Sequence, residues 1–297
     1  MITFGANKTL KAILSRQVTF FDYIQILKPR ETSLLTFIGL SSGIIAGKGW
    51  LPPYLFVLLL ITIALLSAGC NGLTNYLDRE TDAKMLRTRN RALPSKRINP
   101  PQKVLPLIVG LIITALALAW FLHPLSFVFG LIGTVASAIW RKTVSCVFFG
   151  IIAGSTPVLI GWFAVNPVFN EQILLLYLLI SIWIPLHVWS VMMANRDDYL
   201  NAGLNYFPLS LEVKTVVKIL LALSLLLYSA SILFYLAGEA GLLFLVIANI
   251  MGILMVYANT RLLFSLTSKA AWQVYKLSAF PYLGVIFLSL CLDILIT

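Results

Sequence analysis

Apolar runs of about 20 residues recur along this chain of 297 residues, and they limit the folds that are open to it. A helix of about 20 apolar residues crosses the roughly 30 Å hydrocarbon layer of a bilayer. Hydrophobic residues make up 60% of the sequence, whereas soluble domains are about 45–50% apolar. The pattern predicts an all-α polytopic membrane protein, embedded in the lipid bilayer and built as a single domain over residues 1–297.

Short connections, several of them marked by proline or glycine, separate the apolar runs into nine predicted transmembrane helices. The predicted spans are residues 33–48, 53–76, 104–122, 125–140, 146–165, 172–193, 216–237, 240–258 and 279–296. Three connections are longer, at about 77–103, 194–215 and 259–278.

Almost all basic residues lie on one side of this nine-span arrangement. The N-terminal arm at 1–30 lies on the same side. Only Lys48, of 22 lysines and arginines, lies on the other side. The positive-inside rule then predicts a multi-pass protein of the cell membrane, with its N-terminus in the cytoplasm and its C-terminus outside. A net charge of +11 is explained by this topology and indicates no nucleic-acid partner. The lack of acids before Asp22 also resembles a transit peptide, so the mitochondrial inner membrane is the alternative.

A cluster of acids, NYLDRETD at residues 75–82, follows the second predicted span. If that helix continues beyond the bilayer, Asn71, Asn75, Asp78 and Asp82 lie on one face of it. Carboxylates one turn apart repel each other, and a membrane helix tolerates them best with cations between them. Mg²⁺ suits such oxygen ligands and takes one or two carboxylates together with phosphate oxygens.

Three arginines follow the acids, in the segment KMLRTRNR. Guanidinium groups bind phosphate through two parallel hydrogen bonds, so Arg87, Arg89 and Arg91 are candidates to contact a phosphate group. Acids for a metal beside arginines for phosphate predict a metal-diphosphate site. The alternative is a solvated cytoplasmic loop of mixed charge.

A second polar cluster follows the sixth predicted span, in the segment WIPLHVWSVMMANRDDYLNAG at residues 183–203. His187 and Asp198 share a helical face, so His187 is predicted to face the acids from within the membrane. Two acidic clusters on one membrane face suggest that both bind one diphosphate through more than one Mg²⁺. Taken alone, Asp197 and Asp198 could also be an ordinary charge pair at a helix end. His187 could be a polar residue within the membrane whose hydrogen bonds are satisfied by the protein.

Four sequence elements occur in the order found in a known family. They are LKPRETSLLTFIGLSSG, YLDRETDAKMLRTRNRALP, GSTPVLIGW and WIPLHVWSVMMANRDDYLNAGLNYFP, and together they cover residues 27 to about 208. The chain resembles the UbiA superfamily of intramembrane prenyltransferases, within it the protoheme IX farnesyltransferase branch. The NxxDxxxD motif of the superfamily corresponds to Asn75, Asp78 and Asp82.

The resemblance implies a UbiA-type helical bundle with a cytoplasm-facing active site. It implies Mg²⁺ as cofactor, with farnesyl diphosphate and protoheme IX as substrates. The implied reaction transfers farnesyl to a heme vinyl group and gives heme O. It also suggests contact with a downstream heme A synthase or with cytochrome oxidase assembly.

The resemblance also assigns roles to the polar residues. Asn75, Asp78 and Asp82 are expected to hold one Mg²⁺, and Asp198 with Asp197 another. The expected diphosphate contacts are Arg87, Arg91, Arg196 and Lys142. Lys28 and Arg30 are expected to meet the heme propionates or the diphosphate, or to serve only as cytoplasmic anchors. His187 is expected to approach the heme.

The sequence departs from the branch pattern at several positions. Ala92 and Leu186 replace prolines, Val188 replaces a phenylalanine and Lys96 stands where glycine is usual. None of these changes removes a carboxylate or the histidine, so they affect the expected acceptor more than the diphosphate chemistry.

Three other functions are open to a chain with these features. A UbiA enzyme for a quinone precursor, a chlorophyllide or a glycerol lipid is the nearest alternative. A transporter or channel is less favoured, because transporters bind their substrates near the bilayer midplane and both acidic clusters lie at a membrane face. A heme-binding structural subunit is weaker still, because His123 and His187 are predicted near opposite membrane faces.

Overall fold

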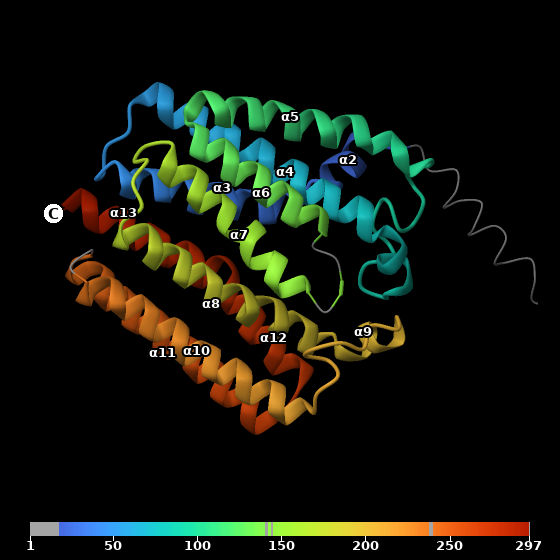
Figure 1. Ribbon diagram of the computed structural model, residues 1–297. Helices are drawn as coiled ribbons and strands as arrows, with labels where there is room; N and C mark the ends of the chain where they lie inside the picture. Colours follow the sequence, from blue (N-terminus) through green and yellow to red (C-terminus); the bar gives the residue numbers. More distant parts are fainter. Residues whose placement is uncertain (1–17, 140–141, 144, 238–239, 297) are drawn as a thin grey trace, which may run out of the picture.

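The chain folds into a bundle of helices that run side by side (Figure 1). The computed structural model describes residues 18–139, 142–143, 145–237 and 240–296, and these ranges contain helices and connections without a strand. The helices are α2 (Phe20–Ile26), α3 (Pro29–Ala46), α4 (Pro53–Lys84), η1 (Pro101–Val104), α5 (Leu105–Leu122), α6 (Pro124–Ile139), α7 (Cys146–Phe163), α8 (Glu171–Ala194), α9 (Arg196–Asn201), α10 (Val213–Leu236), α11 (Leu242–Ser265), α12 (Ser268–Leu277), η2 (Ser278–Gly284) and α13 (Val285–Ile296).

Seven helical stretches of the described residues are long and apolar enough to cross a membrane. They are Pro53–Lys84, Pro101–Leu122, Cys146–Phe163, Glu171–Ala194, Val213–Leu236, Leu242–Ser265 and Ser268–Ile296. Helix α6 is apolar but shorter, and α3 is not among the seven. The prediction of an all-α multi-pass protein is therefore confirmed, and the count of nine spans stays a prediction.

Large apolar side chains cover much of the outer surface of the bundle. Phe121 is 78% exposed, Leu236 71% and Phe264 84%. A soluble monomer rarely leaves so much apolar surface in water, whereas a bilayer covers it. The surface thus agrees with the apolar composition of the helices.

Helices α3 and α7 pack closely because small residues line their contact. A methyl group on Gly161 would collide with the carbonyl oxygen of Gly39. Next to this contact, the Ser42 hydroxyl donates to the carbonyl oxygen of Val158 at 2.8 Å. This close approach fixes the depth at which α3 enters the bundle, and with it the position of Lys28 at its start.

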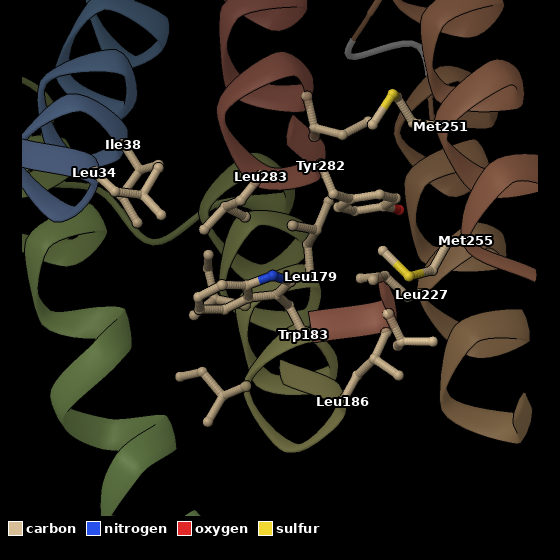
Figure 2. Close-up of a cluster of buried hydrophobic side chains, with 14 of the residues drawn as sticks. Leu34, Ile38, Leu179, Trp183, Leu186, Leu227, Met251, Met255, Tyr282 and Leu283 are labelled. Carbon is tan, nitrogen blue, oxygen red and sulfur yellow. The ribbon is translucent and has the colours of Figure 1, made fainter. Parts of the chain in front are cut away.

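A buried cluster joins α8 to α3, α10, α11 and the last helices (Figure 2). The cluster is built around Trp183 and Tyr282, with leucine and methionine side chains between them. Tyr282 belongs to η2, a π-helical segment in which Ala279 leaves helical geometry. The kink lies at the start of the predicted span 279–296, and the helical stretch that contains this span begins earlier, at Ser268.

The long polar connections lie together at one end of the bundle, the end that holds α2 and α9 (Figure 1). Helix α4 continues to Lys84 as one helix of 32 residues, so the predicted connection 77–103 begins later than expected. The predicted connection 194–215 contains α9. Arg97 ties α2 to the first of these connections through an ion pair with Asp22 at 2.9 Å.

Candidate active site

Two neighbouring pockets at this end of the bundle share part of their lining. The polar pocket has a volume of about 240 Å³ and the apolar pocket has a volume of about 190 Å³. The residues that line both are Lys28, Glu31, Thr74, His187 and Val188. The polar pocket is further lined by Asn75, Asp78, Asp82, Arg87, Arg91, Lys142, Cys146, Val191, Met192, Tyr199, Tyr206 and Tyr275.

The apolar pocket lies between α3, α4, α6, α7 and α8. Leucine, isoleucine and small side chains form most of its wall. Gly133 and Gly154 are among them, and a methyl group on Gly133 would collide with the side chain of Thr156. The small residues leave space in the bundle for a long apolar group.

Asp82 is the most deeply buried carboxylate of the polar pocket, with 2% of its surface exposed. Arg91 Nη1 lies 3.3 Å from Asp82 Oδ2, and Lys142 Nζ forms an ion pair with Oδ1. The Thr88 hydroxyl donates to the Asp82 carbonyl oxygen at 2.8 Å, which holds the turn after α4 against the helix end. A buried charge needs such partners, so Asp82 is held between two cations of the chain, which the sequence analysis had expected at the diphosphate and not on this acid.

The other motif residues lie on the same face of α4, because the helix continues without a break. Asn75 Nδ2 donates to the Ile26 carbonyl oxygen at 2.6 Å. The amide oxygen of Asn75 takes no part in this hydrogen bond. Asn71 donates to the hydroxyl of Thr32 at 3.0 Å. Asp78 and Asn75 both line the polar pocket.

Asp198 joins the two polar connections that the sequence placed on one membrane face. Its carboxylate accepts the backbone N–H of Leu86 at 2.6 Å and that of Arg87 at 3.1 Å. The structure therefore brings the second acidic cluster to the first. It uses the Asp198 carboxylate to fix the segment that carries Arg87.

Arg196 and Asp197 are not brought to the polar pocket. Both line a different depression, beside α10, α11 and the start of α12, and Arg196 Nη2 donates to the Leu209 carbonyl oxygen at 3.0 Å. Their expected roles came from the family resemblance, and the helical face that joins His187 to Asp198 does not include them. In the structure the helix also breaks between α8 and α9, at Asn195. Arg30 is exposed and lines neither pocket.

Lys28 lies where the two pockets meet, just before α3. Its backbone has the left-handed conformation, with φ of 47°, and Pro29 then begins the helix. Burial lowers the pKa of Lys28 below its usual value, and the nearby Arg91 lowers it further. An anion placed beside Lys28 would therefore strongly stabilise the charged form of its amine.

The sequence interpretation missed five polar residues of the pocket. They are Glu31, Thr74, Tyr199, Tyr206 and Tyr275. Burial raises the pKa of Tyr199 and Tyr206, so both phenols stay protonated and can donate hydrogen bonds to an anion. Tyr199 follows directly after the acids of the second cluster, and this adjacency was the one signal available for it.

A divalent cation fits this pocket only together with an anionic ligand. Among the described residues, no group of three or more histidine, cysteine or acidic side chains is placed to hold a metal ion. Mg²⁺ needs one or two carboxylates when phosphate oxygens and waters complete its shell. Asp78, Asp82 and the amide oxygen of Asn75 provide that donor set.

Comparison with known proteins now decides the family. The profile described as the UbiA prenyltransferase family matches residues 34–286. The chain belongs to this family. Within UbiA it falls in the protoheme IX farnesyltransferase branch, because it is 33% identical over 283 residues to the "Protoheme IX farnesyltransferase" of Desulforudis audaxviator, covering 92% of this chain and 88% of the relative. The "Protoheme IX farnesyltransferase 1" of Picrophilus torridus is 34% identical, covering 89% and 91%.

Solved UbiA structures share the fold of this chain. A structure from a study of digeranylgeranylglyceryl phosphate synthase superposes with a TM-score of 0.76 at 18% identity, covering 93% of this chain and 99% of its own. A UbiA homologue from Archaeoglobus fulgidus bound to GPP and Mg²⁺ gives a TM-score of 0.64 at 15% identity, covering 91% and 99%. At these identities the likeness establishes the UbiA fold alone.

Proposed function

We propose that the chain transfers a farnesyl group from farnesyl diphosphate to a vinyl group of protoheme IX, giving heme O. The observation that carries the proposal is the junction of the two pockets. A pocket with both carboxylates and cations adjoins an apolar pocket of similar size, and five residues line both. A prenyl diphosphate has the same two parts, and relatives that match nearly the whole chain are named for this reaction.

The polar pocket is the proposed site of the diphosphate. Arg87, Arg91, Lys142 and Lys28 line it and supply positive charge. As the C–O bond of the allylic diphosphate breaks, negative charge gathers on the leaving group, so these cations stabilise the transition state more than the ground state. Protonated Tyr199 and Tyr206 add neutral hydrogen-bond donors.

Mg²⁺ bound by Asn75, Asp78 and Asp82 would supply further charge neutralisation of the diphosphate. Asp198 contributes by holding the backbone of Leu86 and Arg87 in place. A role for Asp197, Arg196 or Arg30 at the diphosphate would require these side chains to move from the positions described above. Asp197 and Arg196 are therefore better placed to stabilise the helices beside α9.

The apolar pocket is the proposed site of the isoprenoid chain. It keeps water away from the allylic cation, which would otherwise be hydrolysed. The terminal carbon of the heme vinyl group forms the new C–C bond to the farnesyl carbon that lost diphosphate. Water then adds to the other vinyl carbon and releases a proton, which leaves a hydroxyethylfarnesyl side chain.

The remaining parts of the proposal concern the membrane. One domain with nine spans, a cytoplasmic N-terminus and an external C-terminus would place the polar pocket at the cytoplasmic face of the cell membrane. The basic residues of the connections support this orientation. Farnesyl diphosphate would then reach the pocket from the cytosol, and a heme A synthase in the same membrane would consume the product.

The test is turnover by the purified full chain with Mg²⁺, farnesyl diphosphate and protoheme IX, with products read by mass. A hydroxyfarnesyl group added to heme is the expected result. Asp78→Asn should abolish it with the fold intact, and Asp197→Asn, which changes the exposed acid outside the pocket, should retain it. Diphosphate release without heme modification would point to another acceptor, and no consumption of farnesyl diphosphate by folded protein would refute the proposal.

A further inference from the structure

His187 of α8 lies where the two pockets meet and contributes to the lining of both. Aromatic rings hold its imidazole. The ring centroid lies 4.8 Å from that of Trp183, with 17° between the planes, and 4.7 Å from that of Tyr275, with 32° between the planes. Because these contacts fix the plane of the imidazole, they also fix the directions in which its nitrogens point.

The hydrogen bonds of Ser278 determine which nitrogen of His187 carries the proton. Ser278 Oγ donates its single hydrogen to the Tyr275 carbonyl oxygen at 2.9 Å. It can therefore only accept from His187 Nδ1, which lies 2.8 Å away. His187 is thus the Nδ1–H tautomer, and its Nε2 carries a free lone pair.

Ser278 begins the π-helical segment Ser278–Gly284, and this segment brings it against α8. Its carbonyl oxygen accepts the indole N–H of Trp183 at 2.5 Å. One residue therefore fixes both the imidazole and the indole that stacks on it. Short π-helical segments are frequent at functional sites, where they aim a particular backbone or side-chain group.

The surroundings of His187 suit a neutral imidazole. Among the described residues no salt bridge joins it to a carboxylate, including Glu31, which lines the same pockets. Its Nδ1 partner is a hydroxyl group rather than an acid. A general base here would have to carry a positive charge that no carboxylate of the described residues contacts directly, whereas a metal ligand acts in the neutral form.

We propose that His187 Nε2 is an axial ligand of the heme iron, and that Ser278 is the residue that positions it. This inference rests on the proposed function, because it takes an iron porphyrin as the acceptor. Neutral imidazole is a common ligand of heme iron. Coordination at the pocket junction would hold the porphyrin beside the carbon at which the diphosphate and the prenyl chain meet.

The test is spectroscopy of heme bound to the purified full chain. Resonance Raman spectra of the ferrous complex should contain an iron–histidine stretch in the wild type. The stretch should be lost in His187→Gly and an iron–imidazole stretch regained when imidazole is added. Ser278→Ala should shift the stretch and weaken heme binding about tenfold or more, as loss of a partner to a ligating histidine commonly does.

Ser231→Ala is the matched control. Ser231 is also a buried serine, and its hydroxyl lies 3.0 Å from that of Tyr282 in the same π-helical segment, but it lines neither pocket. The spectrum and the heme affinity of Ser231→Ala should equal those of the wild type. Equal effects of the two serine substitutions would refute the positioning role of Ser278.

A wild type without the iron–histidine stretch would overturn the inference without reference to any variant. Persistence of the stretch in His187→Gly would overturn it as well. Product mass separates this result from the proposed function. Farnesylated heme formed by a protein that lacks the stretch would leave the function standing and refute the ligand. A protein that shows the stretch and forms no product would support the ligand and refute the function.

Discussion

Replacing Asp198 by alanine tests whether the two polar connections depend on each other. The Asp198 carboxylate accepts the backbone N–H groups of Leu86 and Arg87. The alanine removes both acceptors and leaves the two N–H groups to water. We expect the segment that carries Arg87 to open more often, and turnover to fall because Arg87 no longer keeps its place in the polar pocket.

The size of the effect follows from the two hydrogen bonds. A hydrogen bond to a charged group contributes about 1.5–3 kcal/mol, so two would contribute about 3–6 kcal/mol in a buried site. Leu86 and Arg87 are exposed, and water competes for their N–H groups, so we expect about 2 kcal/mol in total. Since about 1.4 kcal/mol corresponds to a factor of ten, the two amides should exchange about 30-fold faster.

Hydrogen exchange of a peptide covering residues 85–90 measures this change, with Asp197→Ala as the matched control. Asp197 is the adjacent acid, is exposed and lines the other depression. Its replacement should leave exchange of the peptide unchanged. Asp198→Asn keeps one acceptor oxygen, so it should accelerate one of the two amides more than the other.

Unchanged exchange in Asp198→Ala would refute the reasoning, because it would show that the carboxylate does not hold the segment. If turnover were lost while exchange stayed at the wild-type rate, Asp198 would act directly on the metal or the diphosphate. The same two measurements therefore distinguish a positioning carboxylate from a ligand.

Four further predictions concern charge, pH, chain length and topology. Asp82→Asn frees Arg91 and Lys142, so inorganic diphosphate should bind about tenfold more tightly without Mg²⁺, by calorimetry, although turnover falls. Because burial lowers the pKa of Lys28, its charge is complete below that pKa and lost above it, so affinity for a non-reactive farnesyl thiolodiphosphate should fall as pH rises through the lowered pKa. Lys28→Arg should move this fall beyond the measured range. Ala153→Phe, in the wall of the apolar pocket, should shift kcat/KM about tenfold from farnesyl towards geranyl diphosphate. A cysteine placed in 84–97 should react with an impermeant reagent from the cytoplasmic side only, and labelling from outside would contradict the nine-span topology.

The first acidic motif could be placed from the sequence because one regular element carries it. Asn75, Asp78 and Asp82 follow the helical repeat, and α4 continues through all three. Helical periodicity was sufficient to place these residues on one face. The ion pairs of Asp82 with Arg91 and Lys142 were not predicted, because both cations had been assigned to the diphosphate.

The second cluster could not be placed as well, because a helix break lies inside it. Asn195 separates α8 from α9. His187 lies before the break and reaches the pocket junction, whereas Arg196 and Asp197 follow it and line another surface. A helix break of one residue changes the direction in which all later side chains point. No periodic pattern in the sequence shows which way the side chains of α9 point.

Two departures from the family pattern acquire a physical meaning in the structure. Ala92, which stands in place of a proline, donates its backbone N–H to Gln25 Oε1 at 3.1 Å, a bond that proline could not form. Lys96, which stands where glycine is usual, has a φ of 59°. This left-handed conformation costs a residue with a side chain about 1–2 kcal/mol, and Arg97 then offsets it by its ion pair with Asp22.

The charges around Asp82 explain how one pocket can be stable both with and without a diphosphate. A buried carboxylate without partners would destabilise the fold, and Arg91 and Lys142 supply those partners within the chain. Under the proposed function, a divalent cation takes their place on Asp82, and the two side chains then face phosphate oxygens. Each of these charged groups then has a partner of opposite sign in both states. The residues that neutralise Asp82 before binding are therefore well placed to bind the leaving group after it.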